Sequence, residues 1–158
     1  MNRLEHLTRL IGYEDWANRE FADALARQPA PEALRQFAHL VSAQTLWLDR
    51  IAHRPLSAPV WPEWDLAECV KRLDLVRAGW KNFFRGLDAG ALDTTINYVN
   101  TKGSYYQSTV GDIISHVLFH GSYHRGSVAS ALRAAGGVPP TTDFIHAVRT
   151  GVLGSGGD

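Results

Sequence analysis

Three histidines recur at four-residue intervals in the stretch HVLFHGSYHRG, which covers His116, His120 and His124. Imidazole nitrogens bind transition metals, and residues four apart lie on the same side of a helix. The outer two histidines, however, stand about 12 Å apart along a helix axis, whereas zinc–nitrogen bonds are only about 2.1 Å long. One ion can therefore take His116 with His120, or His120 with His124, but not all three.

The apolar pattern of the predicted helix over 109–135 favours the second pair. Its inner face is marked by Ile113, Val117, Val128, Ala131 and Leu132. His124 projects into this face and His120 lies close beside it, whereas His116 sits at the margin. Two imidazoles on one buried edge are costly without partners, which favours a metal site over simple packing.

A third ligand has to come from a facing helix, and His6, His39 and His53 are the candidates. In the helix predicted over 31–53, His39 lies at the edge of the apolar arc, near Leu46. His53 groups with the polar residues of that helix. The projection therefore favours His39 as the third ligand.

Four amphipathic helices are expected to position these residues. Apolar residues at three- and four-residue spacing predict helices over 3–27, over 31–53, from Asp65 to about residue 87, and over 109–135. Each helix has one apolar stripe that needs a partner. The predicted fold is therefore all-α, a four-helix bundle.

The connections refine this fold. Residues 54–64 contain three prolines and could span roughly 36 Å, enough for a long crossover between parallel helices. Residues 94–107 alternate and turn near Lys102, as in a small hairpin before the last helix. We expect a single domain over 1–150 and a flexible glycine-rich tail over 151–158.

Charge and composition exclude several classes of protein. Sixteen basic residues balance sixteen acidic ones, and the chain has no basic run, so neither a nucleic acid nor a membrane is an expected partner. The first residues carry charges rather than the apolar core of a signal peptide, so we expect a cytoplasmic protein. The single cysteine, Cys69, excludes an internal disulfide and is expected to be a small buried apolar residue.

Three stretches together resemble the DinB family of bacterial proteins: YEDWAN, FAHLVSAQTLWLDRI and HVLFHGSYHRGSVASALRAAGGVPPTTDF. The resemblance covers nearly the whole chain. It implies a four-helix bundle with a long crossover, often assembled as a homodimer. It also implies a divalent metal, commonly zinc or nickel, bound by three histidines.

On this chain the resemblance implies His39, His120 and His124 as the metal ligands. His116 would then be a pocket residue one turn from His120. Arg125 and Gly126 complete the HRG signature of the family without an obvious role as ligands.

Glu14 and Asn18 project onto the inner stripe of the first helix, where a solvated charge is out of place. Either both line a wet cleft or the helix rolls to expose them, and we favour the cleft. Glu14 and His116 are the candidate catalytic residues, as handlers of protons.

Three protein ligands leave a position on the metal for water or substrate, as in catalytic sites. The resemblance extends to relatives that use low-molecular-weight thiols as co-substrates. We therefore expect a metal-dependent enzyme of thiol-transferase or hydrolase type that acts on a small molecule. The alternative is a non-catalytic metal-binding stress protein, which a closed coordination sphere would favour.

Overall fold

The computed structural model describes residues 1–153 and is predominantly helical, as predicted. Four long helices carry the fold: α1 (Arg3–Arg27), α2 (Pro31–Ile51), α3 (Leu66–Arg85) and α4 (Val110–Ala134). The other elements are a short 3-10 helix, η1 (Ala89–Asp93), two strands, β1 (Thr95–Val99) and β2 (Tyr105–Thr109), and a last helix, α5 (Phe144–Arg149). Among the described residues, no helix combines the length and the apolar character needed to cross a membrane.

Local capping explains where α1, α3 and α4 begin, and Pro31 occupies the first turn of α2. Asn2 accepts a hydrogen bond from the backbone N–H of Glu5, whose side chain accepts one in return from the N–H of Asn2. The side chains of Asp65 and Thr109 cap α3 and α4 by accepting from the backbone N–H groups of Glu68 and Asp112. The helix starts therefore lie within one residue of the predicted ones.

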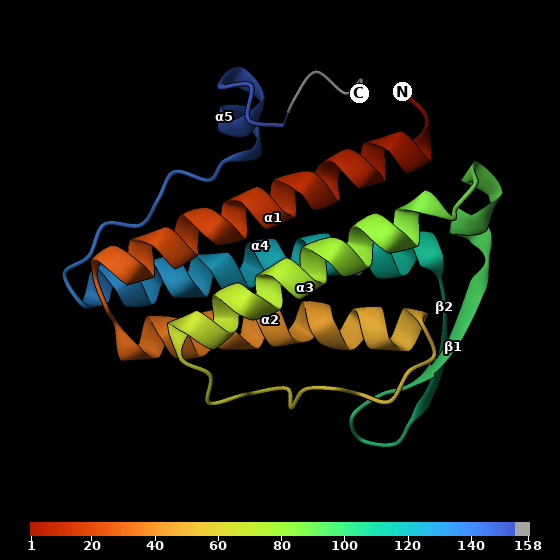
Figure 1. The fold of residues 1–158 in the computed structure, drawn as a ribbon, viewed down its shortest axis with the longest axis horizontal. Coiled ribbons are helices and arrows are strands. Elements are labelled where there is room, and N and C mark those ends of the chain that lie inside the picture. The colour runs from red at the N-terminus through yellow and green to blue at the C-terminus, as the bar shows by residue number, and fades with distance from the viewer. Residues whose placement is uncertain (154–158) are drawn as a thin grey trace.

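The four long helices lie side by side (Figure 1). Helix α2 runs antiparallel to α1, and the segment over 52–65 then returns along the length of α2. Helix α3 consequently runs parallel to α2, and α4 runs antiparallel to both. The long proline-containing segment is thus a crossover, which covers one side of α2.

Two apolar clusters fill the interior. One lies where α1 ends and α2 begins and includes Phe21, Leu25, Phe37, Leu73, Val128 and Leu132. The other lies at the opposite end and includes Leu7, Ile11, Leu48, Trp80, Ile114 and Val117. Between them, at mid-height of the helices, lie four buried polar residues: Glu14, Asn18, Gln44 and Arg125. The middle of the molecule therefore carries most of its buried polar chemistry.

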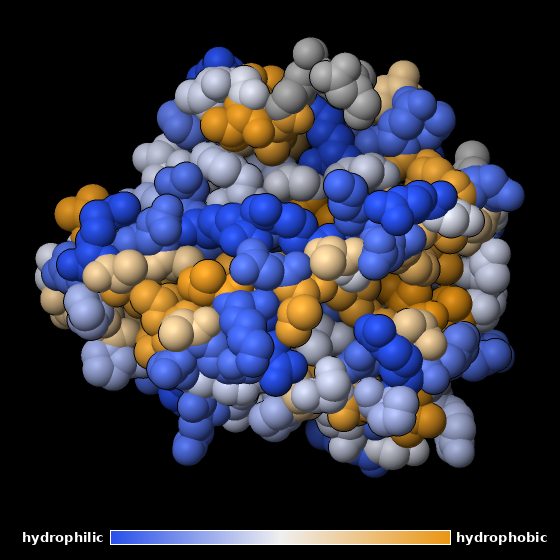
Figure 2. Space-filling model, viewed as in Figure 1, coloured by the Kyte–Doolittle hydropathy of each residue, from blue (hydrophilic) through white to orange (hydrophobic). Residues whose placement is uncertain are grey.

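Ion pairs join α1 to α3 on the surface. Asp15 contacts Arg19 at 3.1 Å on its own helix and Arg77 at 2.7 Å on α3, and Arg19 reaches Asp74 at 2.9 Å. Figure 2 shows this face, where hydrophilic residues cover most of α1 and apolar patches show between them and α3. Surface pairs of this kind contribute little stability individually.

The predicted hairpin is present. Strands β1 and β2 pair antiparallel, with Thr95 opposite Thr109 and Val99 opposite Tyr105. Gly103 in the turn has φ +83°, a left-handed conformation that glycine adopts without strain. The hairpin extends from one end of the four long helices (Figure 1).

Helix α5 was not predicted from the sequence. Its Phe144 packs edge-on against Tyr13 of α1 with ring centroids 5.2 Å apart, and the Tyr13 hydroxyl donates to the Thr142 carbonyl at 2.7 Å. Of the tail predicted over 151–158, residues 151–153 form a turn after α5, and 154–158 lie outside the described residues.

Candidate metal centre

The structure brings His39 of α2 together with His120 and His124 of α4. One ring nitrogen from each lies within 4.8 Å of the others. Nitrogens that share one ion through bonds of about 2.1 Å can be at most about 4.2 Å apart, so small ring rotations would close the site. The three residues fit a divalent ion in number, type and spacing.

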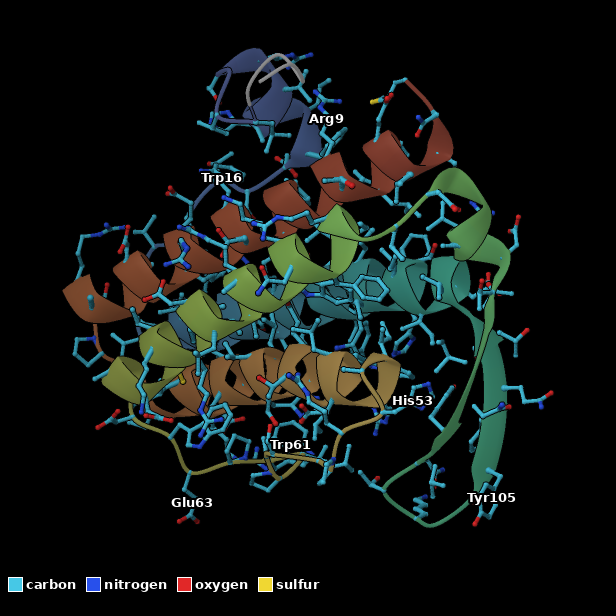
Figure 3. All side chains as sticks on the ribbon, turned by 45° about the vertical axis from the view of Figure 1, so that its right-hand side comes forward. Arg9, Trp16, His53, Trp61, Glu63 and Tyr105 are labelled. Atoms are coloured by element: carbon cyan, nitrogen blue, oxygen red, sulfur yellow. The ribbon has the colours of Figure 1, made fainter. Side chains whose placement is uncertain are left out.

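A hydrogen bond from the crossover orients His39. Its Nδ1–H donates to the carbonyl oxygen of Val60 at 2.7 Å, since a carbonyl can only accept. The proton is therefore on Nδ1, and Nε2 keeps the lone pair that a metal needs. Trp61, also on the crossover, stacks on the His39 ring with the ring centroids 3.9 Å apart. Figure 3 shows Trp61 beneath α2.

The electrostatics of the site keep the histidines neutral. Burial lowers the pKa of His39, and burial together with the neighbouring histidines lowers the pKa of His120 to about 4. Burial and His39 also lower the pKa of His124. Neutral imidazole is the form that binds metals. Moreover, Nδ1 of His124 is buried without a hydrogen-bond partner among the described residues, a cost that a bound ion could remove.

His116 lies next to this triad rather than in it. Its ring centroid is 5.5 Å from that of His120 and 5.0 Å from that of Trp47. Desolvation, followed by the positive charge of Arg50, lowers the pKa of His116. The other two histidines considered as ligands lie elsewhere: His53 is exposed beyond the end of α2 (Figure 3), and His6 is on α1 beside an apolar pocket.

Glu14 lies in a buried polar network instead of a wet cleft. It is 1% exposed and forms an ion pair with Arg125 of α4 at 2.6 Å. Its Oε1 also accepts hydrogen bonds from Asn18 at 3.3 Å and from Gln44 at 3.1 Å. Burial raises the pKa of Glu14, and the Arg125 guanidinium opposes this shift. Neither of the two expected situations, a cleft or a rolled helix, describes this arrangement.

The network adjoins the segment of α4 that carries the candidate ligands. Glu14 packs against the backbone at Gly121, the residue after His120, and Arg125 follows His124. Arg125 in turn donates to Asn18 at 3.0 Å and to Ser122 at 3.1 Å. The HRG arginine therefore ties α4 to α1 at the level of the triad, a role that the sequence did not reveal.

Fold and site together are those of a helical protein with a candidate three-histidine metal centre. The family model for the DinB family matches residues 5–150, and the chain therefore belongs to the DinB family. Protein DinB of Bacillus subtilis (strain 168) is 21% identical over an alignment of length 154, and the match covers 86% of this chain and 90% of that relative. The resemblance found in the sequence motifs is thus confirmed.

Proposed function

We propose that this protein binds one divalent ion, zinc or nickel, through His39, His120 and His124 and acts as a metal-dependent enzyme. The observation that carries the proposal is the convergence of three ligand nitrogens within 4.8 Å from two helices. We assign the scaffold to the four-helix bundles with one long crossover. Three protein ligands leave room for a water or a substrate.

The reaction that we propose is thiol transfer or hydrolysis on a small molecule. A divalent ion at this site supplies Lewis acidity, which can activate a water or a low-molecular-weight thiol. His116 is our first candidate for the proton handler, because it is neutral near pH 7 and lies one turn from His120. Glu14 is the second, although its ion pair with Arg125 better supports a role in positioning α4.

Elemental analysis tests the metal site directly. We expect close to one divalent ion per chain in the purified protein, and loss of most of it in His39→Ala, His120→Ala and His124→Ala. The control is His53→Ala, which removes an exposed histidine of the same part of the chain and should leave the metal content unchanged. Stoichiometric metal in the three ligand variants would contradict the proposal.

Activity is tested with a panel of cellular thiols and an electrophilic acceptor, followed by simple esters and amides. Turnover should require the ion and disappear in His120→Ala. Cys69→Ser should remain active, because this thiol is fully buried and burial raises its pKa to about 12. If no substrate turns over although ligands raise the melting temperature, the protein is a binding protein and not an enzyme.

We also propose that the protein acts as a homodimer in the cytoplasm, as the family resemblance implies. Phe119 and Tyr123, one turn apart on α4, are 76% and 74% exposed, which supports association through this face. Light scattering on the purified protein tests the oligomeric state. A monomer at micromolar concentration would refute the dimer.

A further inference from the structure

Arg50, near the end of α2, is a half-buried cation without a carboxylate partner. Within residues 1–153, no acidic group lies at ion-pair distance from its guanidinium, and its Nε is buried without a hydrogen-bond partner. The guanidinium lies 4.5 Å from the ring centroid of Trp47 and 6.0 Å from that of Tyr98. Burial lowers the pKa of Arg50, which reflects the cost of keeping this charge unpaired.

The neighbouring acid is already occupied. Asp49 forms an ion pair with Arg54 through Oδ1 at 3.1 Å. Its Oδ2 accepts hydrogen bonds from the backbone N–H and the hydroxyl of Ser57 on the crossover, at 2.8 and 2.7 Å. Asp49 therefore pairs with groups on the outer side of α2, and the guanidinium of Arg50 keeps its hydrogen-bond donors free on the other side.

A row of rings connects Arg50 to the metal centre. The Trp47 ring contacts His116, and His116 contacts His120, with centroid separations of 5.0 and 5.5 Å. Residues 39 and 50 are eleven apart, which is about three helical turns, so both lie on the same side of α2, about 16 Å apart along its axis. Because the Arg50 side chain folds onto Trp47, its guanidinium lies closer to the triad than this spacing suggests.

The charges around the site also favour an anionic substrate. The three ligand histidines are neutral, and the group that could hold the ion contains no carboxylate within the described part of the chain. A divalent ion in the triad and the guanidinium of Arg50 would then both be positive, with no fixed negative charge between them. A substrate that carries a carboxylate would neutralise part of this excess.

We propose that Arg50, flanked by Trp47 and Tyr98, binds the carboxylate of an anionic substrate whose other end reaches the metal. The two terminal nitrogens of the guanidinium offer a pair of donors, the geometry that a carboxylate accepts. The guanidinium lies over the rings of Trp47 and Tyr98, the arrangement of a cation–π contact. This subsite rests on the proposed metal function and adds the class of substrate to it.

Calorimetric titration of the zinc-loaded protein tests the subsite. The probes are mercaptoacetate, mercaptopropionate and mercaptobutyrate, each paired with its neutral primary amide. We expect the best acid to bind about ten-fold more tightly than its amide, and Arg50→Gln to reduce this preference to about two-fold or less. The matched control is Arg85→Gln, which removes an exposed arginine from the last turn of α3 and should keep the preference.

Zinc content and unfolding curves are measured for every variant. If the proposed metal function is wrong, the wild-type protein holds no zinc. If only the subsite is wrong, the wild type still holds zinc, but it binds the acids no better than their amides or does not bind the acids. A preference that survives in Arg50→Gln, or that Arg85→Gln removes equally, would also overturn the proposal. Should Arg50→Gln misfold, Arg50→Lys replaces it and should lower the preference, because an ammonium cannot offer the paired donors.

Discussion

The carboxylate of Glu14 lies directly against the bare Cα of Gly121, where a methyl group would overlap Oε1. This contact brings α1 close to α4 beside the candidate ligand His120. Gly121 is required here by the close approach and not by its backbone conformation, which is helical. The buried network and the candidate metal centre therefore depend on the same short segment of α4.

Gly121→Ala should lower the free energy of unfolding by roughly 2–4 kcal/mol, because Glu14 is held by Arg125 and cannot move aside. The matched control is Gly126→Ala on the same helix, where an added Cβ meets no atom within 4 Å. That variant should be neutral or slightly stabilising, since alanine favours helix over glycine by up to about 1 kcal/mol. Urea denaturation measures both, and equal effects would refute the close contact.

Breaking the buried ion pair should be more damaging than replacing both partners. Glu14→Gln leaves the Arg125 guanidinium buried without its counter-charge, and we expect a loss of about 3–5 kcal/mol in the free energy of unfolding. Adding Arg125→Met to Glu14→Gln should restore part of this loss. Additive losses in the double variant would show that the two residues do not interact.

The apoprotein should lose stability in acid because of its histidines. The pKa of His120 is about 4 in the folded chain, below the ordinary value of about 6.5 expected after unfolding. Between these values the unfolded chain binds a proton that the folded chain does not, so stability falls as the pH falls through this window, and is unaffected above it.

We expect the free energy of unfolding to fall by roughly 1–2 kcal/mol between pH 7 and pH 4, after allowance for solvent screening of a partly exposed ring. Denaturation of chelator-treated protein at several pH values measures it. His120→Ala should show a shallower decline than the wild type. Parallel pH profiles for the two proteins would contradict the assignment.

The four long helices could be predicted because their signals are local. An apolar period of 3.6 residues extends over some twenty positions in each, and capping residues such as Asp65 and Thr109 mark the starts. The choice of His120 and His124 as candidate ligands followed from the same periodicity. His39 needed the family resemblance as well, because projection placed it only at the edge of the apolar arc.

The features that the sequence did not reveal depend on distant contacts. Helix α5 has six residues, too few for a periodic pattern, and its packing on Tyr13 links residues far apart in the chain. Glu14 was recognised as out of place on an apolar stripe, but its partner Arg125 lies over a hundred residues away. Likewise, the stacking of Trp61 on His39 depends on the path of the crossover.

The histidine triad joins α2 to α4, with about 80 residues of chain between His39 and His120. An ion held there would act as a reversible cross-link, and the entropy removed from an unfolded chain by such a closure grows with the logarithm of the loop length. The chain has a single cysteine and so no covalent staple of its own. The lifetime of the folded protein would then rise and fall with the supply of metal in the cell.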